Sequence, residues 1–349
     1  MLWLLACTAP PTPLTLELPA YVAPPPMPAD NPLTVEGVAL GRRLFYDPGL
    51  SADGALSCAS CHQQARAFTD GLPRSLDRFG QPLPRNAMSL VNLAWEPSFT
   101  WDGARDSIEA QALAVLTNPR EHAQDLDALS ARLRADRSYR AAFTAAFPDE
   151  GVSPQNIARA LAQFIRTIVS FDAKIDQMGR GEYEMSPLEA RGSDVLIAPL
   201  PAGSPAAQPD LCNRCHDQLA GLRPGEGFPK AGLFASPGYF DDGQPSEDPG
   251  RAGVSGDEAD RGRFRAPTMR NIAVTGPYLH DGRFASLEAL LRSYDTHLSA
   301  SRDLPDTLRP GGQPAPLGFS DADIEAVLAV LALFTDETLL SDPRYGPPP

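Results

Sequence analysis

The sequence predicts an all-α fold of two similar domains with long loops. Apolar residues recur at helical spacing in several segments, and no segment shows a convincing strand alternation. A second observation is a layout that occurs twice, in which a predicted helix and a loop precede the pattern Cys-x-x-Cys-His. Proline is about twice as frequent as usual, with 37 of 349 residues, which predicts long irregular segments between the helices.

The repeated pattern spans residues 58–62 and 212–216 and is the signature of c-type haem attachment. Its cysteines lie one helical turn apart and can reach both vinyl groups of one porphyrin, and the histidine supplies an axial nitrogen. A four-cysteine zinc site also uses two Cys-x-x-Cys pairs, but it needs no histidine after both. We therefore expect two cytochrome c-like domains with one covalent haem c each, attached through the following residues: Cys58, Cys61 and His62, and Cys212, Cys215 and His216.

The helices are expected in the following order. The first begins at Thr34, a suitable N-cap, and others cover 106–116 and 126–133. A long apolar helix follows the cap Ser153 with proline at its first position, and the first domain, residues 31–180, ends soon after it. The second domain, 181–349, repeats the layout from Ser186 and ends with a helix that opens with a capping-box pattern at Ser320.

Residues 1–30 are interpreted as a truncated signal and a proline-rich tether. Cys7 follows Leu-Leu-Ala, which is similar to a lipoprotein cleavage box, but the charged region and longer apolar core of a signal peptide are missing before it. Either the start is truncated, which we favour, or the match is fortuitous. Because haem c attachment requires export, we expect a periplasmic protein with Cys7 as a candidate lipid anchor. No apolar run reaches transmembrane length.

The net charge of −14 argues against a nucleic-acid partner, which requires a basic surface. The negative charge is compatible with a basic protein partner, but it is equally compatible with a simple role in solubility.

Segments outside the haem motifs resemble the bacterial di-haem cytochrome c peroxidase and MauG family, over about residues 31–336. The resembling segments are GRRLFYD (41–47), AFTDG (67–71), RNAMSLVN (85–92), TWDGA (100–104), NPRE (118–121), APTMRNI (266–272) and PYLHDGR (277–283). The resemblance implies a peroxidase that reduces hydrogen peroxide at the first haem and exchanges electrons with a protein partner.

The resemblance also implies roles for individual residues. Glu121 would be the acid–base group on the distal side of the first haem, Gln111 would orient peroxide, and Trp101 would carry electrons between the haems. In an arbitrary sequence, Gln111 would be interpreted as a residue on a solvated helix face and Glu121 as an exposed acid in a loop. The spacing of ten residues from Trp101 to Gln111 and again to Glu121 reverses that preference. Asn86, Thr275 and Pro277 match a calcium site between the domains, the last two through main-chain carbonyls.

Two departures from the usual family pattern concern the iron ligands. The loop 76–84 contains no histidine, so the distal ligand that blocks the first iron in typical members is missing, and we expect an open five-coordinate iron. The usual axial Met of the second haem is replaced by Tyr294, fourteen residues after His280. Tyr294 lies on the apolar face of its predicted helix. This placement fits a core tyrosine whose hydroxyl is hydrogen-bonded to a neighbour. It also fits an iron ligand, and the match to the position of the usual Met favours the ligand. His122 and His297 are given no ligand role.

A tyrosine ligand stabilises oxidised iron, so the second haem would accept electrons poorly and would store an oxidising equivalent well. This pattern favours a MauG-like enzyme that oxidises a protein or another large reductant. The alternative is a conventional peroxidase with a small cytochrome or cupredoxin donor, and a third interpretation is a di-haem electron-transfer protein without peroxide chemistry.

Overall fold

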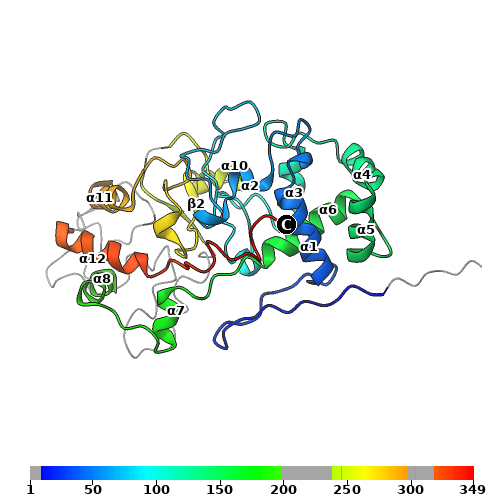
Figure 1. Ribbon diagram of the computed structural model, residues 1–349. Helices are drawn as coiled ribbons and strands as arrows, with labels where there is room; N and C mark the ends of the chain where they lie inside the picture. Colours follow the sequence, from blue (N-terminus) through cyan, green and yellow to red (C-terminus); the bar gives the residue numbers. More distant parts are fainter. Residues whose placement is uncertain (1–8, 198–237, 245, 298–302, 304–317) are drawn as a thin grey trace, which may run out of the picture.

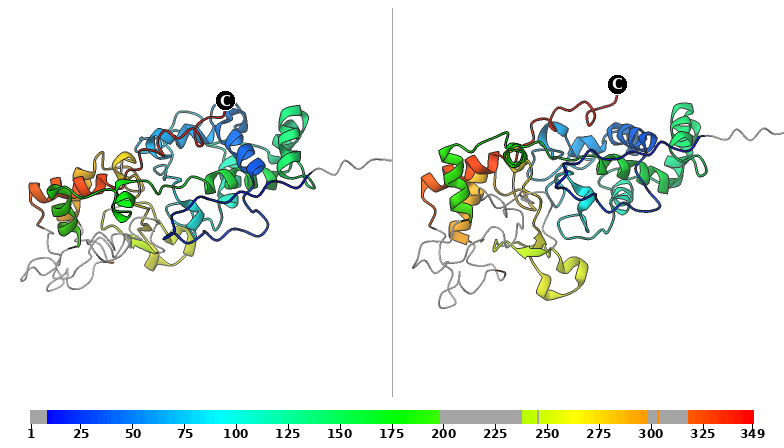
Figure 2. Two further views of the ribbon diagram at one scale, coloured as in Figure 1. Left: turned by 60° about the horizontal axis from the view of Figure 1, so that its bottom comes forward. Right: turned by 90° about the horizontal axis from the view of Figure 1, so that it is seen from below.

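The computed structural model describes residues 9–197, 238–244, 246–297, 303 and 318–349. Two groups of helices form the ends of an elongated body, and loops fill the region between them (Figures 1 and 2). The predicted all-α class is confirmed. In the described residues, sheet is limited to the antiparallel strands β1 (Tyr239–Asp241) and β2 (Arg263–Arg265), which pair with Tyr239 opposite Arg265.

The first group contains α1 (Val35–Tyr46), α3 (Ile108–Thr117), α4 (Leu126–Ala135), α5 (Arg137–Ala146) and α6 (Pro154–Arg166). The hydroxyls of Thr34 and Ser153 accept from the first turns of α1 and α6, as their sequence positions predict. α1 and α6 cross at Gly41, where a Cβ would lie 1.9 Å from the carbonyl oxygen of Ala160. Sequence reasoning missed α5, although Tyr139, Phe143 and Ala146 give it a buried face at helical spacing.

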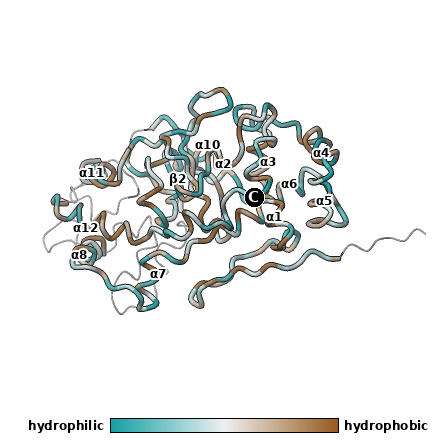
Figure 3. The backbone as a smooth tube through the Cα atoms, in the orientation of Figure 1, coloured by the Kyte–Doolittle hydropathy of each residue, from teal (hydrophilic) through white to brown (hydrophobic). Residues whose placement is uncertain are grey.

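The second group contains α7 (Lys174–Gly179), α8 (Pro187–Ile197), α11 (Leu287–His297) and α12 (Asp321–Ala332). α12 begins with hydrophilic residues under the Ser320 cap and becomes apolar toward its end (Figure 3). It crosses α8 at Gly192, where a Cβ would lie 1.9 Å from the carbonyl oxygen of Ala326. The glycine-mediated crossing of the first group is thus repeated, which agrees with the internal repeat seen in the sequence.

Short helices lie mostly in the loops between the two groups. They are η1 (Pro48–Leu50), α2 (Cys58–Cys61), η2 (Gln64–Arg66), η3 (Leu93–Trp95), α10 (Ala252–Ser255), η4 (Glu258–Asp260) and η5 (Ile272–Val274).

Each helical group has its own apolar core. Ala173 and Ile175, which precede the domain boundary expected from the sequence, pack in the second core. Leu339 and Tyr345, near the end of the chain, pack in the first core. The last residues therefore cross back to the first group, where Arg42 donates from its Nε to the carbonyl of Gly346 at 2.7 Å.

The proline-rich segment expected as a tether contacts both helical groups from residue 12 onward. The amide of Val35 donates to Thr12, and the indole of Trp95 donates to the carbonyl of Ala23 at 2.8 Å. The Tyr21 hydroxyl donates to Asp176 in the second group. Cys7 lies outside the described residues. Among the described helices, none is both long enough and apolar enough to cross a membrane.

Candidate functional site

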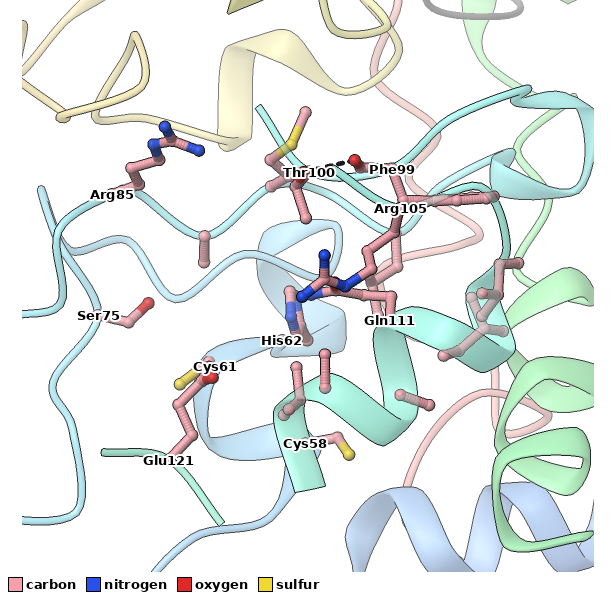
Figure 4. Close-up of a pocket in the computed structure, with 18 of the residues that line it drawn as sticks. Cys58, Cys61, His62, Ser75, Arg85, Phe99, Thr100, Arg105, Gln111 and Glu121 are labelled. Atoms are coloured by element: carbon pink, nitrogen blue, oxygen red, sulfur yellow. Dashed lines mark hydrogen bonds between the residues drawn. The ribbon is translucent and has the colours of Figure 1, made fainter. Parts of the chain in front are cut away.

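A cavity of about 670 Å³ opens between α2, α3 and the loops around residues 83–91 and 118–122 (Figure 4). The residues that line it include all those expected from the sequence at the first haem site: Cys58, Cys61, His62, Trp101, Gln111 and Glu121. The volume lies within the range of about 300–1,000 Å³ that is typical of cofactor and ligand sites. Residues that are more than sixty positions apart in the sequence thus form one site.

His62 presents one ring nitrogen to this cavity. Its Nδ1 lies 2.8 Å from the carbonyl oxygen of Phe68, and burial lowers the pKa of the imidazole. A neutral ring that donates from Nδ1 leaves the Nε2 lone pair for a metal, the usual arrangement of metal-bound histidines. The turn that positions the Phe68 carbonyl has positive φ at Ala67 (48°) and Phe68 (63°), and the buried Phe68 ring anchors it in the first core.

The two thiols flank His62 on the short helix α2, and both line the cavity. Burial raises the pKa of the Cys58 thiol to about 12 and that of the Cys61 thiol to about 11. Both thiols are therefore protonated at neutral pH. Neither cysteine forms a disulfide bond. Two thiols one helical turn apart beside an imidazole that is held at Nδ1 fit a covalently attached porphyrin.

Glu121 and Gln111 supply polar groups to the same cavity. Burial raises the pKa of the Glu121 carboxyl, against the opposing effects of the Asn118 amide, which donates to Oε2 at 2.6 Å, and of the Arg120 charge. A carboxyl whose pKa is raised in this way holds a proton more readily than an exposed one and can act as an acid–base group. Gln111 projects from α3 toward His62, next to the cationic side chain of Arg105 (Figure 4).

A second cavity, of about 230 Å³, lies beside the second helical group. Tyr294 lines it together with the apolar side chains of the same face of α11: Leu287, Leu290 and Leu291. Met269 and His280 also line it. The second attachment motif, Cys212, Cys215 and His216, lies outside the described residues, as does the side chain of His297.

The two cavities share a wall, and Trp101 is part of it. Residues that line both cavities are Asn86, Ala87, Met88, Ser89, Trp101, Arg265, Pro267 and Thr268. Trp101 is 9% exposed, and its backbone carbonyl accepts from the amide of Arg265 at 2.8 Å. The Arg265 guanidinium pairs with Glu96 at 2.8 Å, so a buried ion pair joins the two halves of the protein at this wall.

His280 occupies the position equivalent to Trp101 in the second half, a relationship that sequence reasoning missed. Thr100 and Leu279, the residues before them, share a φ of 71°, and an isolated bridge closes each turn, from Phe99 to Arg105 and from Tyr278 to Phe284. The His280 ring is buried, stacks on Phe264 at 3.8 Å and lies 3.1 Å from the Ser246 hydroxyl. The recurrence of Trp-Asp-Gly as His-Asp-Gly could have revealed the equivalence.

The residues expected to bind calcium, Asn86, Thr275 and Pro277, all line the second cavity. The side-chain amide of Asn86 lies 2.8 Å from the carbonyl oxygen of Leu72 and 3.4 Å from those of Pro73 and Pro277. Thr275 lies two residues before Pro277 and lines the second cavity with it. With the amide turned to present its own oxygen, the cluster is made of oxygen atoms, the donors that calcium prefers.

Comparisons with known proteins agree with this architecture. A profile of the di-haem cytochrome c peroxidase family matches residues 35–184. The methylamine utilization protein MauG of Methylorubrum extorquens is 36% identical over 77% of this chain and 71% of its own length. The cytochrome c551 peroxidase of Nitrosomonas europaea is 32% identical over 75% of this chain and 74% of its own. A solved structure of a MauG-like protein associated with microbial copper homeostasis has a TM-score of 0.80 and 33% identity, covering 96% of this chain and 99% of that one.

Proposed function

The chain belongs to the di-haem cytochrome c peroxidase family, and within this family of oxidoreductases we propose that it is a MauG-like enzyme. In this proposal the first haem reduces hydrogen peroxide and the second passes the oxidising equivalents to a protein or another large reductant. The observation that supports the subtype most is that Tyr294 lines the second cavity from the apolar face of α11.

The first cavity supports an open iron. The loop that usually contributes a blocking histidine gives this cavity Leu76, Leu83 and Pro84, and none of these side chains can bind iron. With Cys58, Cys61 and His62 holding the haem, the bound iron would supply the redox chemistry of peroxide cleavage. Cleavage of the O–O bond requires a proton to move from one peroxide oxygen to the other, and Glu121 is the group that can carry it. Gln111 would hold the peroxide by hydrogen bonding.

Tyr294 and His216 would be the protein ligands of the second haem iron. An anionic tyrosinate favours oxidised iron, so electrons from a small cytochrome would enter poorly and oxidising equivalents would be retained. Trp101 would connect the two centres, because it belongs to the wall that both cavities share. Calcium at Asn86, Thr275 and Pro277 would fix that wall. Export to the periplasm would follow from haem c attachment, and the Leu-Leu-Ala sequence before Cys7 would make this cysteine the lipid anchor.

The test is electron paramagnetic resonance of the resting protein, followed by titration with peroxide. We expect one high-spin and one low-spin ferric haem, with one equivalent of peroxide changing the optical spectra of both. A methionine-type ferrous spectrum with a high potential at the second haem would instead identify the conventional peroxidase; among the described residues, Met88 and Met269 line this cavity. Two low-spin haems whose spectra do not change when peroxide is added would identify an electron-transfer protein.

A further inference from the structure

His122 is a buried histidine in the wall of the first cavity, and the proposed chemistry has not yet used it. It is 3% exposed, and neither ring nitrogen has a hydrogen-bond partner in the described protein. Burial of an unpaired polar group costs free energy, so packing alone would favour an apolar side chain here. The two ring nitrogens are therefore available for a function other than packing.

His122 lines the cavity and contacts the loop that carries Asp53. On the inner side it follows Glu121, and both residues line the cavity. On the outer side the amide of Ala52 donates to the His122 carbonyl at 2.8 Å, which holds the loop with the exposed Asp53 against it. The negative charge of Asp53 acts on the His122 ring.

The charged groups around His122 leave the ring neutral at physiological pH. Burial lowers the pKa of His122 to about 4, and Asp53 opposes this shift. Asp53 itself pairs with Arg78 at 2.7 Å, and Arg120, beside Glu121, pairs with Asp77 at 2.8 Å, so the nearby cations are already engaged. A neutral imidazole has one donor and one acceptor nitrogen, which is what a group that passes protons needs.

Peroxide reduction creates a demand for protons at this position. Conversion of one hydrogen peroxide to two waters consumes two electrons and two protons. Glu121 can move a proton between the two peroxide oxygens, but the net uptake has to come from solvent.

We propose that His122 is a proton-relay residue that connects the surface at Asp53 with Glu121. One ring nitrogen accepts a proton from the Asp53 side, and the other releases a proton toward Glu121. The ring then returns to its first tautomer, so each cycle moves one proton and no electrons. The inference rests on the proposed peroxide chemistry of the first haem, and it assigns His122 no bond to iron.

The principal variant is His122→Met in the full-length protein with both haems attached. Methionine fills a similar volume and removes both nitrogens. We expect unchanged haem content and a thermal midpoint no lower than that of wild type, because no hydrogen bond is lost. The reaction with peroxide should slow by about tenfold or more and acquire a solvent deuterium isotope effect, as expected when proton delivery becomes limiting.

Two further variants locate the outer end of the relay. Asp53→Asn should slow the same step, and the double variant should be no slower than His122→Met, because both changes interrupt one route. Glu325→Gln, which alters an exposed carboxylate on α12, is the matched control and should react as wild type does.

Cyanide binding separates this inference from the proposed function. Hydrogen cyanide must give up its proton to bind ferric iron as an anion, so its association tests the relay without peroxide. If wild type ignores peroxide but His122→Met slows cyanide association by about tenfold or more, the proposed function fails and the relay stands. Wild-type rates with both reagents in His122→Met would overturn the relay. A resting spectrum that changes from low-spin to high-spin in this variant would also overturn it, because His122 would then be an iron ligand.

Discussion

The indole nitrogen of Trp101 donates to the backbone carbonyl of Asn86 at 2.9 Å. The amide of Asn86 in turn donates to the carbonyl of His280 at 2.7 Å, and its side chain meets the carbonyl of Pro277. One residue therefore links the tryptophan between the cavities to the second half of the protein. The position of Trp101 and the proposed calcium site depend on the same asparagine.

Trp101→Phe should slow the step in which the second haem responds to peroxide, while the first haem still reacts. Phenylalanine keeps most of the packing but loses the indole and its bond to Asn86, at a cost of about 1 kcal/mol in stability. Stopped-flow spectra of the two haems measure the step. Trp95→Phe is the matched control, since Trp95 also donates one bond, to Ala23, but lines neither cavity. Equal rates in the two variants would contradict a role for Trp101 between the haems.

Glu121→Gln should slow the reaction with peroxide by about 100-fold or more, because the amide cannot carry a proton. In wild type the rate should rise with pH through the raised pKa of Glu121, since the carboxylate is the form that accepts the peroxide proton. In the variant this dependence should disappear. Pyridine haemochrome spectra check that both haems remain attached. A wild-type rate in Glu121→Gln would remove Glu121 from the reaction.

Tyr294→Met should raise the reduction potential of the second haem, because methionine favours ferrous iron and tyrosinate favours ferric iron. Spectroelectrochemistry of the fully loaded protein measures the change. Tyr278→Phe is the control, since Tyr278 lines the same cavity but uses its hydroxyl to donate to the carbonyl of Ile272 at 2.8 Å. An unchanged potential in Tyr294→Met would show that Tyr294 does not bind the iron.

Removal of calcium with a chelator should lower stability and slow the response of the second haem. A ligand present at 100 times its dissociation constant stabilises the folded state by about 2.7 kcal/mol, which sets the expected scale. Calcium should restore both properties, whereas magnesium should not, because it prefers a smaller octahedral site with retained waters. Identical melting curves with and without chelator would argue against a calcium site at Asn86.

Stability should fall as the pH drops from about 6.5 to about 4. Burial lowers the pKa of His122 and of His280 to about 4, whereas histidine in an unfolded chain titrates near 6.5. Within this window the unfolded chain binds more protons, so each histidine lowers the free energy of unfolding by up to about 1.4 kcal/mol per pH unit. Urea unfolding across the window measures the slope. His122→Met should reduce it, and an unchanged slope would mean that His122 does not titrate as a buried group.

The sequence by itself determined the features that depend only on residues close together along the chain. The Cys-x-x-Cys-His spacing, the caps at Thr34, Ser153 and Ser320 and the apolar faces of the long helices are local, so they could be read before any tertiary contact was known. The family pattern added Trp101, Gln111 and Glu121, and the structure brings these three to one cavity. Their roles in catalysis stay predictions, as does the bond from Tyr294 to iron.

Tertiary structure alone decided what lies between and around the cavities. Only the folded chain brings Arg265 to Glu96, seats Tyr345 in the first core and aligns His280 with Trp101. His122 shows the physical reason most clearly, because its importance lies in nitrogens that find no partner in the described protein. Burial and hydrogen bonding are properties of the whole packed chain, and residue order does not specify them locally.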